Sequence, residues 1–438
     1  MMNHQNEYSL RRQRLFEQMP QNSLAIIFTA PHFHRSADQE HHFYPDNDFY
    51  YFTGFCEPET AAIFIKSDKE GHRYILFNRP HDPVQEQWCG RRVGQQTAVE
   101  QYGADKAYVY SELLEKLTDC LADKESLYCI WGRYPDNDTI IQTAINQVRK
   151  RVRSGIKMPD TLINLEHLVH EMRLIKSPHE IDLMRKAAEI SANAHIRAMQ
   201  ICRPGMNEYQ LRAELIYEFQ RNGCWDEAYE PIVGAGENGC ILHYIENNQP
   251  LKDGDLVLID AGGRYQYYDA DLTSTFPING KFSPHQKAIY DIVLEAQQTA
   301  FSKIKPGAVW SEMADAALNV IVQGLMDEGL LKGSLSTLIE TQAYMPFYMH
   351  RIGHWLGMDV HDVGRYKIKS EWRKFSPGMV TTVEPGLYIK PGLAVDEKWW
   401  GMGVRIEDNV LITETGMDNL SKMLPRKTDD IEALMATK

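Results

Sequence analysis

The 438-residue chain has no long hydrophobic run and no leader-like N-terminus. A segment of about 18 consecutive apolar residues would be needed to span a bilayer, and none occurs, so we expect no membrane-spanning helix. The N-terminal residues 1–19 are polar, carry Arg11, Arg12 and Arg14, and are not followed by an apolar stretch. This composition argues against a secretory signal peptide.

Paired cysteines and an excess of basic residues are also missing. The seven cysteines are scattered, and none forms a Cys-X-X-Cys pair. This pattern excludes a structural zinc knuckle and does not indicate a disulfide framework, so it favours reduced thiols and a cytoplasmic location. The formal net charge of -13 would repel phosphate backbones and anionic lipid surfaces. We therefore expect neither nucleic acid nor a membrane as a partner.

The first third of the chain predicts alternating strands and helices. Apolar runs at residues 24–29, 61–65 and 74–77 are typical of strands, residues 69–71 predict a turn, and residues 111–121 have helical spacing. Such alternation indicates a mixed α/β (α+β) fold rather than an all-helical or all-strand one.

A second domain is expected to begin near residue 170. The basic stretch 149–159 contains glycine and proline and predicts a surface link. Further on, residues 177–180 read Ser-Pro-His-Glu, a capping box with proline at the first helical position, and residues 181–199 carry apolar side chains at helical spacing. We therefore predict two domains, residues 1–170 and 171–438.

Two carboxylates of the second domain follow directly on apolar strands. Asp260 ends the run 256–259, and Glu384 follows the threonine-rich run 379–383. A buried carboxylate at such a position costs several kcal/mol unless it is paired or binds a metal. A capped strand end remains the alternative for each of them taken alone.

Two further acids lie on neighbouring predicted strands. Asp271 begins the segment 271–276, and a hairpin would bring it across from Asp260. Glu407 shares one face of an alternating strand with Arg405, a position that is usually solvated when taken alone. Four carboxylates gathered in one site would repel one another, and burial would raise their pKa values. Two divalent cations would remove that conflict.

Histidines are concentrated in one glycine-containing segment. His350, His354 and His361 lie within twelve residues, which indicates a functional cluster more than a helical core face. By contrast, His243 is a lone histidine on an expected apolar strand, and the residues alone favour a structural role for it. Another histidine group matches no ligand motif and predicts a polar loop: His32, His34, His41 and His42.

The ligand types also indicate which metal is expected at the acidic site. Oxygen-dominated ligands with one imidazole favour Mn2+, with Co2+, Fe2+ or Zn2+ as alternatives.

The order and local contexts of these residues resemble the pita-bread metallopeptidases. In that family the metal ligands come in the order Asp, Asp, His, Glu, Glu. This sequence supplies the same order: Asp260, Asp271, His354, Glu384 and Glu407. Their contexts match as well: Leu-Ile-Asp-Ala-Gly, Asp-Leu-Thr, Gly-His-Trp-Leu-Gly, Val-Glu-Pro-Gly and Arg-Ile-Glu-Asp. Residues 47–58 look like the N-terminal domain of the aminopeptidase P and prolidase branch. The resemblance thus implies a creatinase/prolidase-like α/β domain followed by a pita-bread catalytic domain.

The resemblance implies a metal-dependent aminopeptidase that releases the N-terminal residue from peptides with proline at the second position, by attack of a hydroxide that bridges two metal ions. Asp271 and Glu407 would bridge the ions, Asp260 would complete one, and His354 and Glu384 the other. Peptides are therefore the expected partners, together with further copies of the chain as a homo-oligomer, a dimer or tetramer.

The same resemblance implies roles around the metals. Glu384 would carry the proton to the leaving nitrogen. His243 and His361 would stabilise the oxyanion or the amide, and His350 would contact the residue after the cut. Arg405 is a further candidate substrate contact. Tyr388 and Trp88 are candidate aromatics of an apolar proline pocket, although isolated residues of this kind more often pack in a core or an interface.

Three alternatives stay open. A prolidase, which cuts only Xaa-Pro dipeptides, would share the fold and the ligands. A non-catalytic binding protein on the same fold would be expected to lose ligands, and creatinase-like amidine hydrolysis would match the peptidase motifs less well. Two departures from the family pattern bear on specificity: Arg351 stands where glycine is usual, and Ser274 where arginine is frequent.

Overall fold

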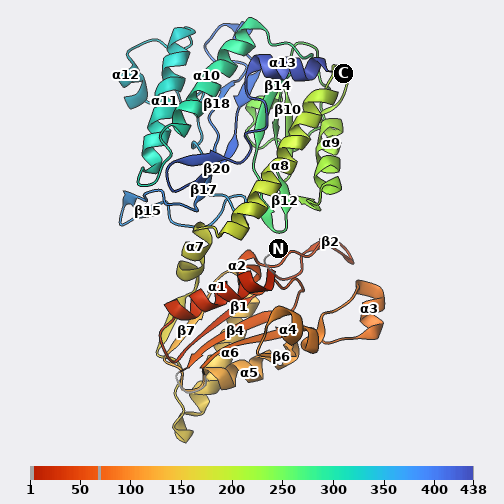
Figure 1. Ribbon diagram of the computed structural model, residues 1–438, viewed down its shortest axis with the longest axis vertical. Coiled ribbons are helices and arrows are strands. Elements are labelled where there is room, and N and C mark those ends of the chain that lie inside the picture. Colours follow the sequence, from red (N-terminus) through yellow and green to blue (C-terminus); the bar gives the residue numbers. More distant parts are fainter. Residues whose placement is uncertain (1–3, 68–70, 438) are drawn as a thin grey trace. The chain divides into compact units, whose positions relative to one another are not determined.

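The computed structural model describes residues 4–67 and 71–437, so Lys69 and Glu70 of the predicted turn lie outside the described residues. The chain divides into two compact units, with the boundary between Met172 and Arg173 (Figure 1). Each unit is built around a hydrophobic core of its own. Within the described ranges, no helix has the length and apolar character needed to cross a membrane.

The first unit is a six-stranded mixed sheet with helices on both faces. The strand order is β6-β5-β4-β1-β7-β8, antiparallel at the centre and parallel at both edges. The strands are β1 (Ser23–Phe28), β4 (Ala61–Ser67), β5 (Gly71–Asn78), β6 (Lys106–Val109), β7 (Ser126–Cys129) and β8 (Thr161–Asn164). All six residues of β1 are buried, as expected for a strand covered on both faces. The three strands predicted from apolar runs are thereby confirmed.

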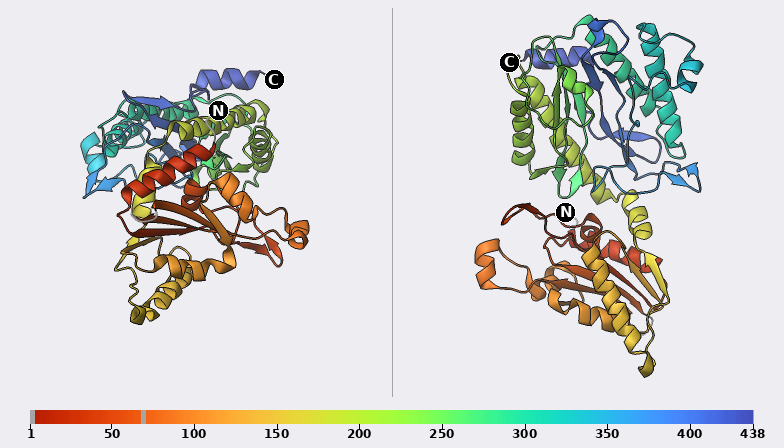
Figure 2. Two further views of the ribbon diagram at one scale, coloured as in Figure 1. Left: turned by 60° about the horizontal axis from the view of Figure 1, so that its bottom comes forward. Right: turned by 180° about the vertical axis from the view of Figure 1, so that it is seen from behind.

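The helices of this unit cover the sheet from two sides (Figure 2). They are α1 (His4–Gln18), α2 (Asn47–Thr53), α3 (Pro83–Cys89), α4 (Gly94–Tyr102), α5 (Leu113–Leu121), α6 (Pro135–Lys150) and α7 (Glu166–Leu174), the last of which runs past the boundary. Phe16 of α1 packs on Phe64 of β4, whereas α5 and α6 pack on the opposite face through Leu117 and Ile141. A short hairpin joins β2 (His34–Ser36) to β3 (Gln39–Glu40). Residues 149–159 lead from α6 through η2 (Val152–Ser154) to β8, inside this unit.

The second unit places small antiparallel sheets between two groups of helices. The helices are α8 (Pro178–Ile201), α9 (Glu208–Arg221), α10 (Pro284–Phe301), α11 (Trp310–Asp327), α12 (Leu335–Glu340) and α13 (Thr428–Ala436). Seen from behind, α8 and α9 flank the strands on one side, and α10 and α11 on the other (Figure 2). The predicted capping box is confirmed, because Ser177 and the Glu180 side chain satisfy one another's backbone N–H groups at the start of α8.

The sheets of this unit bring the ends of several strands together. The strand orders are β10-β11-β14, β13-β12-β9, β17-β20-β21, β18-β19 and β15-β16. Their bounds are β9 (Asp226–Glu227), β10 (Ile232–Ala235), β11 (Leu256–Asp260), β12 (Gly263–Tyr265), β13 (Tyr268–Asp269), β14 (Thr273–Pro277), β15 (Lys367–Ile368), β16 (Glu371–Trp372), β17 (Val380–Val383), β18 (Gly386–Ile389), β19 (Met402–Arg405), β20 (Asp408–Ile412) and β21 (Met417–Asn419). In the antiparallel β11–β14 pair, Asp260 lies opposite Thr273. The predicted pairing of the two segments is found, but the expected register, with Asp260 across from Asp271, was wrong by two residues, and β12 and β13 lie between the two strands.

Two further expectations for this unit were wrong in detail. Residues 239–244 do not form a strand, because the chain turns into the short helix η3 (Gly236–Cys240) and then an irregular loop. The buried Glu208 carboxylate accepts hydrogen bonds from Ala235 N, Tyr244 Oη and two further donors there, so the loop does not need a strand ladder. Residues 403–407 are not one continuous strand either: β19 ends at Arg405, and the chain passes into another sheet as β20.

Candidate functional site

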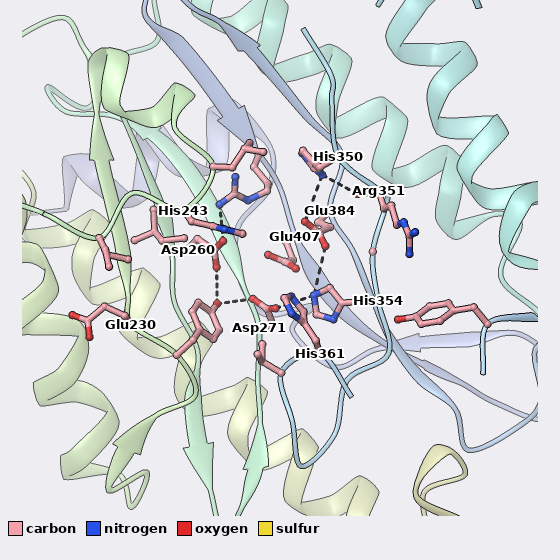
Figure 3. A pocket seen from close by; sticks show the side chains of 18 residues that line it. Glu230, His243, Asp260, Asp271, His350, Arg351, His354, His361, Glu384 and Glu407 are labelled. Atoms are coloured by element: carbon pink, nitrogen blue, oxygen red, sulfur yellow. Dashed lines mark hydrogen bonds and ion pairs between the residues drawn. The ribbon is translucent and has the colours of Figure 1, made fainter. Parts of the chain in front are cut away.

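A cavity of about 600 Å³ lies in the second unit, where β11 and the start of β14 face the loop 350–362 and the strands β17 to β20. The acids and histidines predicted for the metal site and its surroundings all line it: Asp260, Asp271, Glu384, Glu407, His243, His350, His354 and His361. Figure 3 shows their side chains converging from these separate elements. The acids come from strand ends and strand junctions, which explains how residues distant in sequence meet here.

Asp260 and Asp271 are joined by a tyrosine. The hydroxyl of Tyr229 lies 2.6 Å from Oδ1 of Asp260 and 2.5 Å from Oδ1 of Asp271. The backbone at Asp271 is held by Asn409, whose side-chain amide donates to the Asp271 carbonyl and accepts from its N–H. Both carboxylates are therefore fixed in position by neighbours from other elements.

His354 points one ring nitrogen at the acids. Its Nε2 lies 3.3 Å from Oδ2 of Asp271 and 3.6 Å from Oε1 of Glu384. Its Nδ1 lies 3.0 Å from the carbonyl of Trp355, which can accept only if Nδ1 carries the proton. Burial lowers the pKa of His354, but the hydrogen bond and charge of Asp271 raise it to about 9. Loss of the Nε2 proton would leave a lone pair on that nitrogen, facing the carboxylates.

Glu407 lies between β19 and β20, where the chain changes sheets. Its backbone N–H donates to Thr273 O at 3.1 Å, and the Thr273 hydroxyl donates to Oε2 of Glu407 at 2.7 Å. This bridge between two sheets turns the Glu407 side chain into the cavity beside Asp271. Together with His354, the two acids offer ligand atoms that all lie within 4.8 Å of one another, close enough to hold one metal ion.

The crowding of acids shifts their pKa values in the way that the sequence argument anticipated. Burial raises the pKa of Asp260, and raises that of Glu384 to about 7. Burial and the surrounding carboxylates raise the pKa of Glu407 well above its ordinary value. Asp271 differs: burial would raise its pKa, but the hydrogen bond and charge of His354 lower it. The site thus concentrates more negative charge than its side chains neutralise.

Arg405 and Tyr388 form a hydrogen-bonded pair that connects Asp260 with His350. Arg405 donates to Oδ2 of Asp260 at 2.6 Å, to Thr273 Oγ1 at 3.1 Å and to the Tyr388 hydroxyl at 2.9 Å. The same Tyr388 hydroxyl lies 2.8 Å from Nε2 of His350. Tyr388 is fully buried, so its position suits orienting His350 rather than facing the cavity. Burial, together with the charge of Arg405, lowers the pKa of His350 to about 4, so its ring is neutral at neutral pH.

The two remaining histidines are exposed side chains on the cavity wall. The ring of His361 meets the ring of His354 edge-on at a centroid distance of 4.4 Å. Partial burial and the neighbouring His354 lower the pKa of His361. His243, on the irregular loop after η3, lines the same cavity. The residues alone predict His243 on an apolar strand, whereas the structure places it exposed on a loop in the cavity wall.

The loop that carries the histidines is pinned at both ends. At Gly353, a Cβ atom would lie 2.2 Å from the Thr382 carbonyl, so only glycine allows this close approach to β17. Beyond His361, the carboxylate of Asp362 pairs with Arg173 at 2.7 Å and with Lys176 at 2.8 Å. All three of these charged side chains are buried. This triad holds the loop, and with it His354 and His361, against the start of α8.

Not every residue noted in the sequence lies at the site. Trp88 is on α3 of the first unit, and its side chain is 81% exposed. In the N-terminal histidine group, His32 pairs with Glu40 at 3.0 Å. Within the described part of the chain, the one group of side chains with metal-ligand spacing is Asp271, His354 and Glu407, so those histidines form no such group.

Sequence reasoning missed three residues that shape the site. Tyr229 bridges two acids, Asn409 clamps the Asp271 backbone, and Asp362 anchors the histidine loop. Tyr229 stands in an unpatterned stretch before Pro231 and gives no local signal. Asn409 and Asp362 each follow shortly after a residue that was recognised, Glu407 and His361, and this proximity is the signal that could have found them.

Oxygen and imidazole donors that converge in a cavity are the kind that bind divalent metal ions, and the comparisons name the family that carries this site. Residues 182–414 match Metallopeptidase family M24, and residues 8–128 match Aminopeptidase P, N-terminal domain. The chain belongs to metallopeptidase family M24, because that match covers more than half of it. The predicted fold is confirmed: an N-terminal α/β domain of the aminopeptidase P type is followed by a pita-bread metallopeptidase domain.

Individual relatives are similar over nearly the whole chain. The Xaa-Pro aminopeptidase of Escherichia coli (strain K12) is 48% identical, over 98% of this chain and 97% of that protein. The human Xaa-Pro aminopeptidase 3 is 32% identical, over 98% and 86%. The solved structure of Pseudomonas aeruginosa aminopeptidase PepP matches with a TM-score of 0.97 at 49% identity, over 99% and 98% of the two chains. A zinc-substituted E. coli aminopeptidase P in complex with product has the same TM-score and coverage at 48% identity.

Proposed function

We propose that this chain is an Xaa-Pro aminopeptidase, a metal-dependent hydrolase that releases the N-terminal residue from peptides with proline at the second position. The observation that carries the proposal is the convergence of Asp260, Asp271, Glu384 and Glu407 with Nε2 of His354 in one buried site. Two relatives that are similar over nearly the whole chain are named Xaa-Pro aminopeptidases, and the matching solved structure is named an aminopeptidase.

The donor set fits two divalent cations. Asp271 and Glu407 are proposed to contact both ions, Asp260 one of them, and His354 and Glu384 the other. One guanidinium, that of Arg405, pairs with Asp260, so an excess of buried negative charge remains for the ions to balance. The hydrogen bond from His354 Nδ1 to Trp355 O leaves Nε2 free to coordinate, as is usual for ligating histidines.

The protein side chains around the donor set can position the peptide and move its protons. Divalent ions bound there would lower the pKa of a water molecule to about 7 and polarise the scissile carbonyl. Glu384, whose Oε2 lies 3.8 Å from Nδ1 of His350, would carry a proton to the leaving nitrogen. His243 and His361 are proposed to donate to the oxyanion or the amide. His350, oriented by Tyr388, is proposed to contact the residue after the cut.

A preference for proline follows from what the cavity wall offers. The Xaa-Pro bond has no N–H, so a site that required this donor would reject it. Besides the polar cluster, apolar side chains line the cavity: Ile232, Leu242, Ile245 and Val360. Such a wall can accept a pyrrolidine ring, and the free N-terminal amine is proposed to lie near Asp260.

Hydrolysis of an Xaa-Pro-Xaa tripeptide with added Mn2+ tests the proposal. We expect Glu384→Ala and Asp260→Ala to lose at least about 100-fold in rate. The matched control is Glu295→Ala, an exposed acid on α10, which should behave as wild type. Wild type and both variants being equally slow would refute the mechanism. An Xaa-Pro dipeptide is the second substrate: turnover of the dipeptide alone would identify a prolidase instead.

Three finer properties are proposed with it. Mn2+ is the preferred ion, because oxygen ligands dominate the donor set; reconstitution of metal-free protein with Mn2+, Co2+, Fe2+ and Zn2+ would rank them. A cytoplasmic location is supported by seven free cysteines. A homo-oligomer is supported by large exposed side chains on the first unit, Trp88 and Phe33, and light scattering would measure its size.

A further inference from the structure

Arg351 places a cation on the wall of the same cavity. It lies between His350 and His354 in the loop that carries the histidines, and all three residues line the cavity. Its side chain is exposed. Within the described part of the chain, no carboxylate, hydroxyl or carbonyl accepts a hydrogen bond from its guanidinium, and only its backbone carbonyl is engaged, by His350 Nδ1 (Figure 3). The guanidinium is therefore available to a ligand.

The other arginine of the cavity is in the opposite situation. Arg405 makes three hydrogen bonds, to Asp260, Thr273 and Tyr388, and its side chain is 4% exposed. Its charge is already matched by a carboxylate of the cluster. A guanidinium presents five N–H donors in a fork that fits a carboxylate with two parallel hydrogen bonds. The guanidinium of Arg351 has all of these N–H donors available to a ligand in the cavity.

The cavity is therefore charged unequally along its length. Acids gather around His354, where a cationic amine is favoured, whereas Arg351 follows His350 on the side assigned above to the residue after the cut. A short peptide has the matching distribution, with an ammonium group at its N-terminus and a carboxylate at its C-terminus. Tyr366, which also lines the cavity, has its pKa raised by burial, and the charge of Arg351 opposes that rise, so this charge acts inside the cavity.

We propose that Arg351 binds a carboxylate on the leaving-group side of the substrate, the C-terminal carboxylate of a short peptide, and thereby sets a preference for short substrates. The inference rests on the proposed function and deepens it. An aspartate or glutamate side chain after the proline offers the same chemistry within a longer peptide, so the two sources must be separated by experiment.

The test compares matched peptides that differ only in the carboxylate. Ala-Pro-Leu is assayed as the free acid and as the C-terminal amide, and Ala-Pro-Glu as the amide. We expect wild type to prefer the free acid over the amide by roughly tenfold in kcat/KM, mainly through KM, because the contact is made equally in the bound and transition states. The preference should shrink as salt is added, since the cation is exposed.

Variants of Arg351 assign the preference to this side chain. In Arg351→Gln the ratio of acid to amide should fall to about one, and in Arg351→Glu it should invert. The matched control is Arg365→Gln, an exposed arginine of the neighbouring segment that does not line the cavity, and it should keep the wild-type ratio. Equal use of acid and amide by wild type, or an unchanged ratio in Arg351→Gln, would overturn the proposal. If Ala-Pro-Glu amide were cleaved faster than Ala-Pro-Leu amide, and Ala-Pro-Leu acid were not, Arg351 would bind a side-chain carboxylate instead of the C-terminal one.

Binding of the product peptides gives a reading that does not depend on turnover. Calorimetry with Pro-Leu and with Pro-Leu amide should show the same roughly tenfold difference in Kd for wild type, and none for Arg351→Gln. If no peptide is cleaved but this difference is present, the proposed function fails and the carboxylate site stands. If tripeptides are cleaved but acid and amide bind equally, the proposed function stands and the carboxylate site fails.

Discussion

At the scale of single residues, Tyr229 links two carboxylates with one proton. Its hydroxyl lies within hydrogen-bond distance of both Asp260 and Asp271, yet it can donate to only one of them at a time. Both carboxylates also line the cavity, so the hydroxyl fixes two of the proposed ligands side by side. A side chain in this position orients ligands without being one itself.

Removing that hydroxyl should weaken metal binding. We expect Tyr229→Phe to lower the affinity for Mn2+ by roughly 10- to 100-fold, as is typical for a partner that orients metal ligands. Calorimetric titration of metal-free protein measures it. Tyr209→Phe, which alters an exposed tyrosine of α9, is the matched control and should leave the affinity unchanged. An equal affinity in Tyr229→Phe and wild type would show that the hydroxyl does not position the acids.

A second residue, His195, lies behind the site and carries a pH dependence. Its Nε2 donates to Ala261 O at 2.9 Å, and its Nδ1 accepts from the Ser274 hydroxyl at 2.6 Å. Ser274 is one of the two departures noted in the sequence, and the structure gives it this partner. Burial lowers the pKa of His195 to about 4. The folded protein therefore keeps the ring neutral where the unfolded chain, with a pKa near its ordinary value, would protonate it.

The sign of the effect follows from this difference. As the pH falls below about 6.5, the unfolded chain takes up a proton that the folded chain does not, so stability is lost progressively down to about pH 4. We expect wild type to lose up to about 3 kcal/mol over that range through this residue. Urea unfolding of wild type and His195→Gln over the range measures it. If the free energy of unfolding fell equally with pH in both proteins, His195 would not be the source of this pH dependence.

At the scale of elements, the loop 350–362 depends on one buried ion triad. Asp362 accepts from Arg173 and Lys176 in a setting from which water is excluded. Removing the carboxylate takes the ion-pair partner from the buried Lys176 and leaves Arg173 its ion pair with Asp359. We expect Asp362→Asn to cost about 3 kcal/mol of stability. Thermal unfolding measures this cost. The exposed Asp396→Asn is the control, and an unchanged midpoint for Asp362→Asn would show that the triad does not anchor the loop.

Elements with local signals could be predicted from the sequence, and elements set by distant contacts could not. The strands β1, β4 and β5 and the start of α8 follow from apolar runs and a capping box. The apolar residues 239–244 predict a strand, but the chain forms a loop there, because its backbone is held by the carboxylate of Glu208 from the distant α9. The change of sheets near Glu407 likewise depends on its bridge to Thr273, which no local pattern encodes.

The site was predictable to the same extent. Asp260 and Glu384 follow apolar strands, so burial cost alone marked them, and the ordered contexts of the five acidic and histidine residues indicated the family. Tyr229 could not be found, because its role arises only once β11 and β14 bring Asp260 and Asp271 together. Arg351 was visible in the sequence as a departure from the family pattern. Only the structure shows that this residue lines the cavity.

At the scale of the whole molecule, metal should stabilise one unit and not the other. All of the proposed ligands lie after residue 172, in the second unit. A ligand that binds only the folded state at 100 times its Kd stabilises it by about 2.7 kcal/mol. We expect Mn2+ to raise the thermal midpoint of the second unit while leaving that of the first unchanged. Calorimetry in Mn2+ and in a chelator measures this, and Asp271→Asn should abolish the shift.

The central claim is that two cations neutralise the acids of this site. Crystals grown with Mn2+ and measured at a wavelength where manganese scatters anomalously would test it most directly. The account predicts two anomalous peaks per chain, both within ligand distance of Asp271 and Glu407, with Asp260 on one and His354 on the other. An acid cluster with no peak in Mn2+ at saturating concentration, in a protein that still cleaves Xaa-Pro peptides, would contradict it.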